Sequence, residues 1–187
     1  MPRIIETILA LLGLVALSPI LLISFILVRL TSPGPALFKQ IRVGRNQIPF
    51  AIYKISTMHL GTKETGTHLV EAQSVTAIGR VLRKLRLDEI PQLINVIAGD
   101  MSLVGPRPSL PSQTELIAAR SAENVYSVRP GITGLAQIQG LDMSNPVELA
   151  KVDGIYVRDR SFGLDLRIIY KTIIGGAIDT RPNIHLK

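Results

Sequence analysis

The first part of the chain is a long apolar run, and its pattern predicts a membrane element. Residues 7–28 carry no charge between Glu6 and Arg29. As one straight helix the run would measure roughly 33 Å, close to the ~30 Å hydrocarbon thickness of a bilayer. Pro19 follows Ser18 near the midpoint, where its missing N–H and its ring predict a kink or a break in the helix.

Two topologies of this segment stay open on sequence alone. A kinked helix could cross the bilayer, because serine hydroxyls and neighbouring groups can satisfy the carbonyls that Pro19 leaves without a partner. Two shorter helices could instead enter and leave through the same face as a hairpin. Arg3 lies on one flank and Arg29 on the other, so positive charge does not choose between them. The sequence alone favours the crossing helix.

The pattern after the apolar run predicts an α+β fold, mostly helical with a small β-hairpin. Apolar residues alternate on both sides of the Gly44-Arg45-Asn46 turn, which predicts the hairpin within residues 36–58. A polar, glycine-containing run at 59–74 predicts a loop that orders on ligand binding. Helical spacing predicts helices at 76–86, 88–98, 112–122, 146–160 and 164–178. The domain prediction is a membrane segment, 1–30, followed by one folded domain, 31–187.

Composition and charge restrict the chemistry. The chain has 187 residues, a net charge of +7 and a mean hydropathy of +0.33. It contains no cysteine, which excludes disulfides, thiolate catalysis and cysteine-ligated zinc. The three histidines show no metal-binding spacing. The basic balance suits an anionic partner such as lipid headgroups or nucleotide phosphates, whereas the low aromatic content argues against nucleic acid.

Asp88-Glu89 is the sharpest chemical feature of the sequence. An acidic pair before a helix is ordinarily an N-cap that stabilises the positive end of the helix dipole. Here Arg83 lies five residues upstream, and cations of this kind favour an ionised carboxylate. An ionised carboxylate that reaches a phosphate is a nucleophile for phosphoryl transfer and a hard oxygen ligand for Mg²⁺. The pair is therefore a candidate catalytic site.

Three cationic residues are candidates for phosphate binding, each with a simpler structural alternative. Arg107 lies in a Gly-Pro-Arg-Pro turn, which could present one rigid guanidinium to a phosphate or leave it in solvent. Lys54 ends a predicted strand with the same ambiguity. Arg129, in an Arg-Pro-Gly turn, is weak evidence by itself.

Several segments together resemble a known family, over residues 4 to 175. The chain is similar to the bacterial sugar transferases, the small monotopic phosphoglycosyl transferases that act on polyprenyl phosphates. The resemblance rests on the Ser18-Pro19 apolar segment and on the runs SPGPALFKQIRVG, PFAIYK, GRVLRKLRLDEIPQLINVIAGDMSLVGPRP, RPGITGLAQIQG and LDLRIIYKT.

The resemblance implies an activity. Members transfer a sugar 1-phosphate from a UDP-sugar to undecaprenyl phosphate and release UMP, as a first membrane step of glycoconjugate synthesis. It implies a covalent phosphosugar on Asp88, with Glu89 beside it, and Mg²⁺ bound with Asp88 as a ligand. The implied phosphate-binding residues are Arg83, Arg107 and Lys54, and the further implied site residues are Asp165 and Arg129.

The resemblance also implies a topology and a location. The break at Ser18-Pro19 would make a re-entrant helix-break-helix in the phospholipid bilayer. The mixed cationic and apolar faces of the last predicted helix, 164–178, fit an amphipathic helix at the bilayer interface and equally an ordinary core-packing helix. The catalytic domain would lie on the cytoplasmic face of the bacterial inner membrane. This implied topology reverses the preference for a crossing helix. A homodimer is one option for the assembly.

The sequence departs from the family pattern at three places. The Lys-Arg-x-x-Asp run common before the membrane helix is reduced to residues 3–6. Members often have Phe-Arg-Thr-Met where this chain has Ile55-Ser56-Thr57-Met58, so any phosphate contact from that arginine is lost here or supplied elsewhere. The segment 71–76 also lacks the usual Asp-x-Arg-x-Thr-Arg run. The last two departures concern nucleotide-sugar contacts and leave Asp88-Glu89 untouched. The alternative function is a non-catalytic, membrane-anchored basic module that binds anionic lipid or a partner protein.

Overall fold

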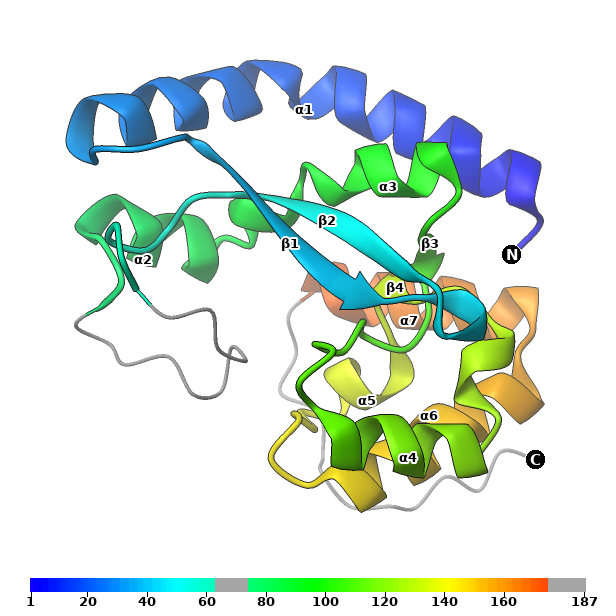
Figure 1. Cartoon of the computed structure of the whole chain (residues 1–187). Helices are drawn as coiled ribbons and strands as arrows, with labels where there is room; N and C mark the ends of the chain where they lie inside the picture. The colour runs from blue at the N-terminus through cyan, green and yellow to red at the C-terminus, as the bar shows by residue number, and fades with distance from the viewer. Residues whose placement is uncertain (63–73, 175–187) are drawn as a thin grey trace.

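One long helix, α1 (Arg3–Thr31), lies over the rest of the molecule (Figure 1). The computed structural model describes residues 1–62 and 74–174. The fold of this part is mostly helical with two small sheets, which confirms the predicted class. Most of the predicted 59–74 loop and the end of the last predicted helix lie outside the described residues.

Helix α1 continues through Pro19 without interruption, so the predicted break into two helices is not observed. The reason is a local hydrogen bond. Pro19 has no N–H to donate to the carbonyl of Val15, and the Ser18 hydroxyl donates to that oxygen instead, at 2.7 Å. The result is one helix whose axis bends along its length (Figure 1). By length and composition α1 could cross a membrane.

Both halves of α1 pack against the same folded domain. In the first half, Ala10 is fully buried against Ile52, Val96 and Met101. In the second half, Val28 is 2% exposed and packs against the cluster that contains Ile55 and Leu82. The outward face of α1 is apolar and exposed, with Ile8, Leu11, Leu12, Val15, Leu22, Ile23, Ile26 and Leu30 among its residues.

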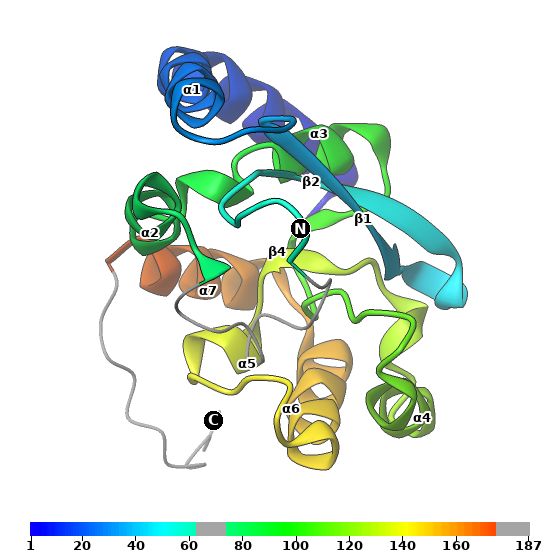
Figure 2. The same ribbon diagram turned by 60° about the vertical axis from the view of Figure 1, so that its left-hand side comes forward.

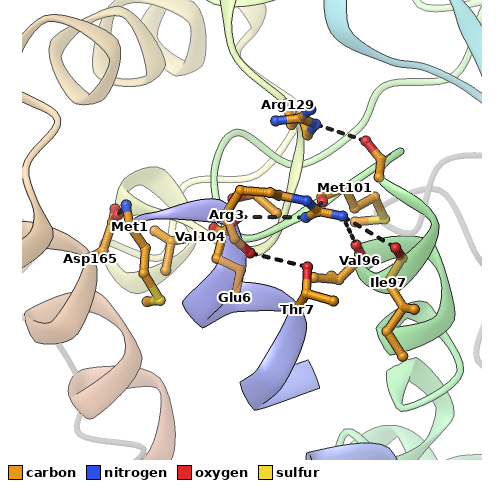
Figure 3. Close-up of polar contacts among 12 residues, drawn as sticks. Met1, Arg3, Glu6, Thr7, Val96, Ile97, Met101, Val104, Arg129 and Asp165 are labelled. Carbon is orange, nitrogen blue, oxygen red and sulfur yellow. Dashed lines mark hydrogen bonds and ion pairs between the residues drawn. The ribbon is translucent and has the colours of Figure 1, made fainter. Parts of the chain in front are cut away.

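The polar start of α1 is also bound to the domain (Figure 3). Arg3 donates to the carbonyls of Met101 and Val96, and the carboxylate of Glu6 accepts from the hydroxyl of Ser102. Glu6 is only 2% exposed, so these bonds satisfy a buried charge that would otherwise be costly. The N-terminal end of α1 is therefore fixed on the domain, like its C-terminal half.

The predicted hairpin is confirmed. Strands β1 (Leu37–Val43) and β2 (Pro49–Ile55) pair antiparallel, with Gln40 opposite Ile52. The connection is a 3₁₀ turn, Arg45–Gln47, that carries two left-handed residues. The side-chain amide of Asn95 donates to Ala51 O at 2.7 Å and accepts from Tyr53 N at 3.2 Å, which attaches the next helical layer to β2.

Helices α2 (Ala77–Lys84) and α3 (Gln92–Ala98) flank the acidic pair. Thr76 caps α2 by accepting a hydrogen bond from Gly79 N, and Gly99, with φ of 101°, ends α3. The prediction that Asp88 opens the second helix is wrong. Arg86 adopts a left-handed conformation with φ of 55°, and the following 3₁₀ turn, Leu87–Glu89, holds the pair before α3 begins.

The remaining elements complete the domain, and the helices within residues 114–159 lie on the side away from α1 (Figure 2). Helices α4 (Thr114–Ala122), α6 (Pro146–Asp159) and α7 (Phe162–Ile174) confirm the helices predicted after residue 110. The sequence did not predict α5 (Leu135–Ile138) or the parallel pair of β3 (Ser102–Val104) and β4 (Gly131–Thr133). Elements of three or four residues are too short for a periodic signal.

The close approach of β3 and β4 yields a prediction about stability. A Cβ at Gly131 would overlap the backbone of Gly105, whereas a Cβ at Gly163 would meet nothing within 4 Å. We therefore expect Gly131→Ala to lower the free energy of unfolding by about 1–3 kcal/mol. Gly163→Ala, in the first turn of α7, should be neutral or stabilise by up to about 1 kcal/mol. Thermal unfolding in detergent micelles measures both, and equal stability of the two variants would contradict this packing.

Candidate active site

The acidic pair lies where α2, α3 and β2 meet. The left-handed residue Arg86 turns the chain between the helices, so that Asp88 and Glu89 point into the domain. Asp88 is 8% exposed, and the side chain of Glu89 is 16% exposed. Two adjacent carboxylates are thus partly removed from water, which is costly unless cations compensate them.

Two cations compensate Glu89. Lys54 Nζ, from β2, lies 3.1 Å from Glu89 Oε1, and Arg107 Nη2, from the Gly-Pro-Arg-Pro loop, lies 2.6 Å from the same oxygen. The sequence separations are 35 and 18 residues. The structure therefore brings together Lys54, Glu89 and Arg107, three residues that the sequence analysis had selected separately.

The electrostatics of the two carboxyl groups differ. Burial would raise the pKa of Glu89, but the ion pairs with Arg107 and Lys54 outweigh it and hold that pKa well below its usual range. The pKa of Asp88 is raised, first by burial and then by the negative charge of Glu89, against the opposing charges of Lys54 and Arg83. The sequence predicts that nearby cations keep Asp88 ionised, and this expectation is corrected. The pKa of Asp88 is raised by burial, and both ion pairs form with Glu89 instead.

Arg83 approaches the acidic pair from α2. Its Nε donates to the hydroxyl of Thr57 at 2.8 Å, and Thr57 is 6% exposed. Its positive charge opposes the rise in the pKa of Asp88 without reversing it. Thr57, which lies in the segment that departs from the family pattern, therefore orients the guanidinium of Arg83.

The Gly-Pro-Arg-Pro loop is held from several sides. Gly131 N donates to Pro106 O at 2.9 Å, and Arg42 Nη1 donates to Pro108 O at 3.1 Å. Arg42 is a buried cation on β1, 5% exposed, which the sequence analysis missed. A charged residue at position 42, between the apolar residues Ile41 and Val43, was the signal that could have drawn attention to it. These bonds hold the loop that presents Arg107.

A cavity of about 700 Å³ contains the candidate residues. Its lining includes Val28 and Pro33 near the C-terminal end of α1, Ala136 of α5, and residues 140–143. The charged side chains that line it are those of Asp88, Glu89, Arg83, Lys54 and Arg107, among others. A volume of this size suits a substrate larger than a single phosphate. The cavity therefore combines apolar residues near α1 with a cluster of charged residues.

Two further candidates, Asp165 and Arg129, are not among the residues that line this cavity. Both make polar contacts elsewhere in the domain (Figure 3). Asp165 is 1% exposed; it accepts from Tyr156 Oη at 2.8 Å and forms an ion pair with the Met1 amine. Arg129 Nε donates to Gly99 O at 2.8 Å, at the end of α3. These contacts stabilise the packing of α1, α3 and α7. A direct role of Asp165 or Arg129 in the active site stays a prediction.

The carboxylates restrict how a metal could bind. No group of three or more histidine, cysteine, aspartate or glutamate ligands occurs within residues 1–62 and 74–174. Glu89 is engaged by two cations, which leaves Asp88 as the carboxylate best placed to serve as a ligand. Mg²⁺ commonly binds through one or two carboxylates together with substrate phosphates and water. The residues therefore fit a Mg²⁺ ion that binds together with a phosphate substrate.

Comparisons with known proteins show the family of the chain. The family model described as "Bacterial sugar transferase" matches residues 1–177. A UDP-glucose:undecaprenyl-phosphate glucose-1-phosphate transferase of Caulobacter vibrioides is 41% identical over 182 residues, covering 91% of this chain and 67% of the relative. Its namesake in Klebsiella pneumoniae is 38% identical, covering 95% of this chain and 40% of the relative.

A third relative carries another sugar in its name. The UDP-N-acetylgalactosamine-undecaprenyl-phosphate N-acetylgalactosaminephosphotransferase of Aeromonas hydrophila is 38% identical over 163 residues, covering 83% of this chain and 38% of the relative. The chain thus spans about two fifths of the length of the two larger relatives. With the family model matching nearly the whole sequence, the chain belongs to the bacterial sugar transferase family.

Proposed function

We propose that this protein transfers a sugar 1-phosphate from a UDP-sugar to undecaprenyl phosphate and releases UMP. The observation that carries the proposal is the arrangement around Glu89, where Lys54 and Arg107 fix one carboxylate directly beside Asp88 in a large cavity. Phosphoryl transfer mainly requires positioning and charge neutralisation, and this cluster supplies both. The names of the relatives support the two substrate classes.

The proposed reaction has two displacements at one phosphorus. First, a carboxylate oxygen of Asp88 attacks the sugar-bearing phosphorus of the UDP-sugar, the bond to the bridging oxygen breaks, and UMP leaves. Second, an oxygen of undecaprenyl phosphate attacks the same phosphorus and releases the Asp88 carboxylate. Glu89 stays ionised and holds Lys54 and Arg107 in place, while Arg83 adds positive charge beside Asp88. This sequence predicts ping-pong kinetics.

Mg²⁺ fits this proposal through Asp88 and the pyrophosphate of the donor. When bound, the ion would neutralise charge on the phosphate oxygens and favour the departure of UMP. The protein contributes a charged interior lined by Lys54, Arg83 and Arg107. Removal of divalent cations with a chelator is expected to abolish UMP release, and restoration by added Mg²⁺ is the matching control.

The contacts of α1 support a membrane element that does not cross the bilayer. Its polar start is bound to α3 and β3, and its second half packs on β2 and α2, so both ends lie on one folded domain. A helix that crossed the hydrocarbon core would carry its ends to opposite faces. The exposed apolar face of α1 would lie in one leaflet, with the domain on the cytoplasmic face of the bacterial inner membrane.

Helix α7 offers a second apolar surface for the membrane interface. Ile168 is fully buried, whereas Leu166, Tyr170 and Ile173 are 46%, 64% and 79% exposed. This mixture shows that α7 contributes to the core with one face and leaves apolar side chains on another. We propose that the exposed side chains contact the interfacial region of the bilayer.

Cysteine labelling tests the proposed topology. The natural chain has no cysteine, so single cysteines report without a background. Pro2→Cys, Thr31→Cys and Lys151→Cys place thiols at three exposed positions, on the two flanks of α1 and on α6. We expect a membrane-impermeant maleimide to label all three from the same side of oriented vesicles. Labelling of residue 2 from the side opposite residue 151 would contradict the non-crossing topology.

The activity itself is tested by a substrate screen. Purified protein is incubated with undecaprenyl phosphate, Mg²⁺ and each of a panel of UDP-sugars, and UMP is measured. We expect release with at least one UDP-hexose or UDP-N-acetylhexosamine. The alternative, a non-catalytic basic module, predicts no release and binding that weakens steeply with salt. The burial of Lys54 and Arg107 against Glu89 disfavours that alternative, because lipid-binding cations lie exposed on a surface.

A further inference from the structure

The loop that presents Arg107 has one more contact, from a buried ion pair between α4 and α6. Arg120 of α4 is 1% exposed, and Asp153 of α6 is 2% exposed. Arg120 Nε and Nη2 donate to Asp153 Oδ2 at 2.9 and 2.6 Å. The third nitrogen, Nη1, donates to the backbone carbonyl of Arg107 at 2.8 Å. Arg120 thus joins two helices to the residue that binds Glu89.

Four consecutive carbonyls of the loop are held by four different donors. Gly131 N, Arg120 Nη1, Arg42 Nη1 and Val43 N bind the oxygens of residues 106, 107, 108 and 109 in that order. Arg120 is the donor at the oxygen of Arg107 itself. A bond at that carbonyl fixes the peptide plane from which the side chain extends toward Glu89, at 2.6 Å.

Stability alone does not explain this ion pair. Two buried charges lose their hydration. A protein with hydrophobic residues of similar volume in their place is often as stable or more stable. Burial raises the pKa of Asp153 against the opposing charge of Arg120, in line with a carboxylate that has lost its hydration. A hydrophobic pair at positions 120 and 153 could not donate a hydrogen bond to Arg107 O, and so could not help to fix the guanidinium of Arg107.

We propose that Arg120, oriented by Asp153, is a positioning residue that fixes Arg107 in the geometry required for phosphoryl transfer. The proposal rests on the proposed function, and it assigns to α4 and α6 a part in catalysis that neither helix plays by direct contact. Arg120 binds the main chain of Arg107, and only the side chain of Arg107 reaches the acidic pair.

A double-mutant cycle tests this role. The variant Arg120→Met/Asp153→Leu replaces the ion pair by apolar side chains and removes the donor to Arg107 O. We expect it to fold, with kcat for UMP release lowered by about tenfold or more and KM for the UDP-sugar changed by less than about threefold. In an Arg107→Ala background the same change should lower kcat by less than about twofold, because the residue that is positioned is gone.

The matched control is the other ion pair between these helices. Arg158 on α6 lies 3.2 Å from Glu123, at the end of α4, and does not bind the loop. Arg158→Met/Glu123→Leu should leave kcat unchanged. If Arg120→Met/Asp153→Leu does not fold, Arg120→Lys, which keeps a cation opposite Asp153, enters the same cycle.

The outcomes separate the two proposals. Wild-type protein without UMP release from any UDP-sugar would refute the proposed function. An active wild type whose kcat survives the loss of Arg120 within about twofold would refute the positioning role alone. Losses that multiply independently in the Arg107→Ala background would also refute it, because they would show that Arg120 acts by another route.

Discussion

Replacing Asp88 with asparagine is expected to abolish UMP release from a UDP-sugar, both with and without undecaprenyl phosphate. The amide keeps the shape of the side chain but is a poor nucleophile, so the first displacement fails. Loss of a nucleophile typically costs roughly 10⁴- to 10⁶-fold in kcat. Asp88 is 8% exposed, and both ion pairs at this site are made by Glu89 and not by Asp88. Because the exchange keeps the shape of the side chain and breaks neither ion pair, it should disturb the fold little.

The matched control is Asp159→Asn, the same chemical change at an exposed residue of α6. It should keep full activity. An Asp88→Asn protein that folds and retains more than about one tenth of wild-type turnover would show that another group is the nucleophile.

Replacing Glu89 with glutamine is expected to weaken both the fold and the activity. The change removes the charge that pairs with Lys54 and Arg107, whose side chains are 15% and 26% exposed. Two like charges would then face a neutral amide, and the loss of one partner from a buried pair costs about 3 kcal/mol. Arg107 would also lose its fixed direction, so we expect kcat to fall by about 10²-fold or more.

Thermal unfolding in detergent micelles and UMP release measure these two effects. The control is Glu123→Gln, which neutralises a carboxylate in the exposed ion pair with Arg158. A solvent-exposed pair contributes only about 0–1 kcal/mol, so this variant should match the wild type in both measurements. Equal stability of Glu89→Gln and Glu123→Gln would contradict the role assigned to Glu89.

Much of the candidate site could be predicted because its residues stand out locally. The adjacent carboxylates and the proline-stiffened arginine each have a distinctive neighbourhood in the sequence. Lys54 stands at the end of a predicted strand and is otherwise indicated only by the family resemblance; the structure shows that it pairs with Glu89, 35 residues away in the chain. Long-range pairs of this kind leave no periodic trace. Arg42, Thr57 and Arg120 were missed for the same reason, since each acts through a tertiary contact.

The fold was predictable where the pattern was long and periodic. The hairpin and the helices α2, α4, α6 and α7 follow the spacing of their apolar residues. Two features did not follow. The short parallel pair of β3 and β4 depends on the close approach of two glycine-containing turns. Helix α1 continues through Pro19, where the Ser18 hydroxyl binds the carbonyl that loses its backbone donor, and propensity alone does not reveal this.

The proposed mechanism requires a covalent phosphosugar at Asp88, and mass spectrometry of the protein detects such an adduct. Purified enzyme is mixed with its UDP-sugar and Mg²⁺ in the absence of undecaprenyl phosphate, quenched and digested. We predict at most one equivalent of UMP per protein and a sugar-phosphate adduct on the peptide that contains Asp88, which disappears when undecaprenyl phosphate is added. Full turnover with acceptor, but no burst and no adduct in its absence, would contradict the covalent mechanism, because it would indicate direct transfer between the two substrates.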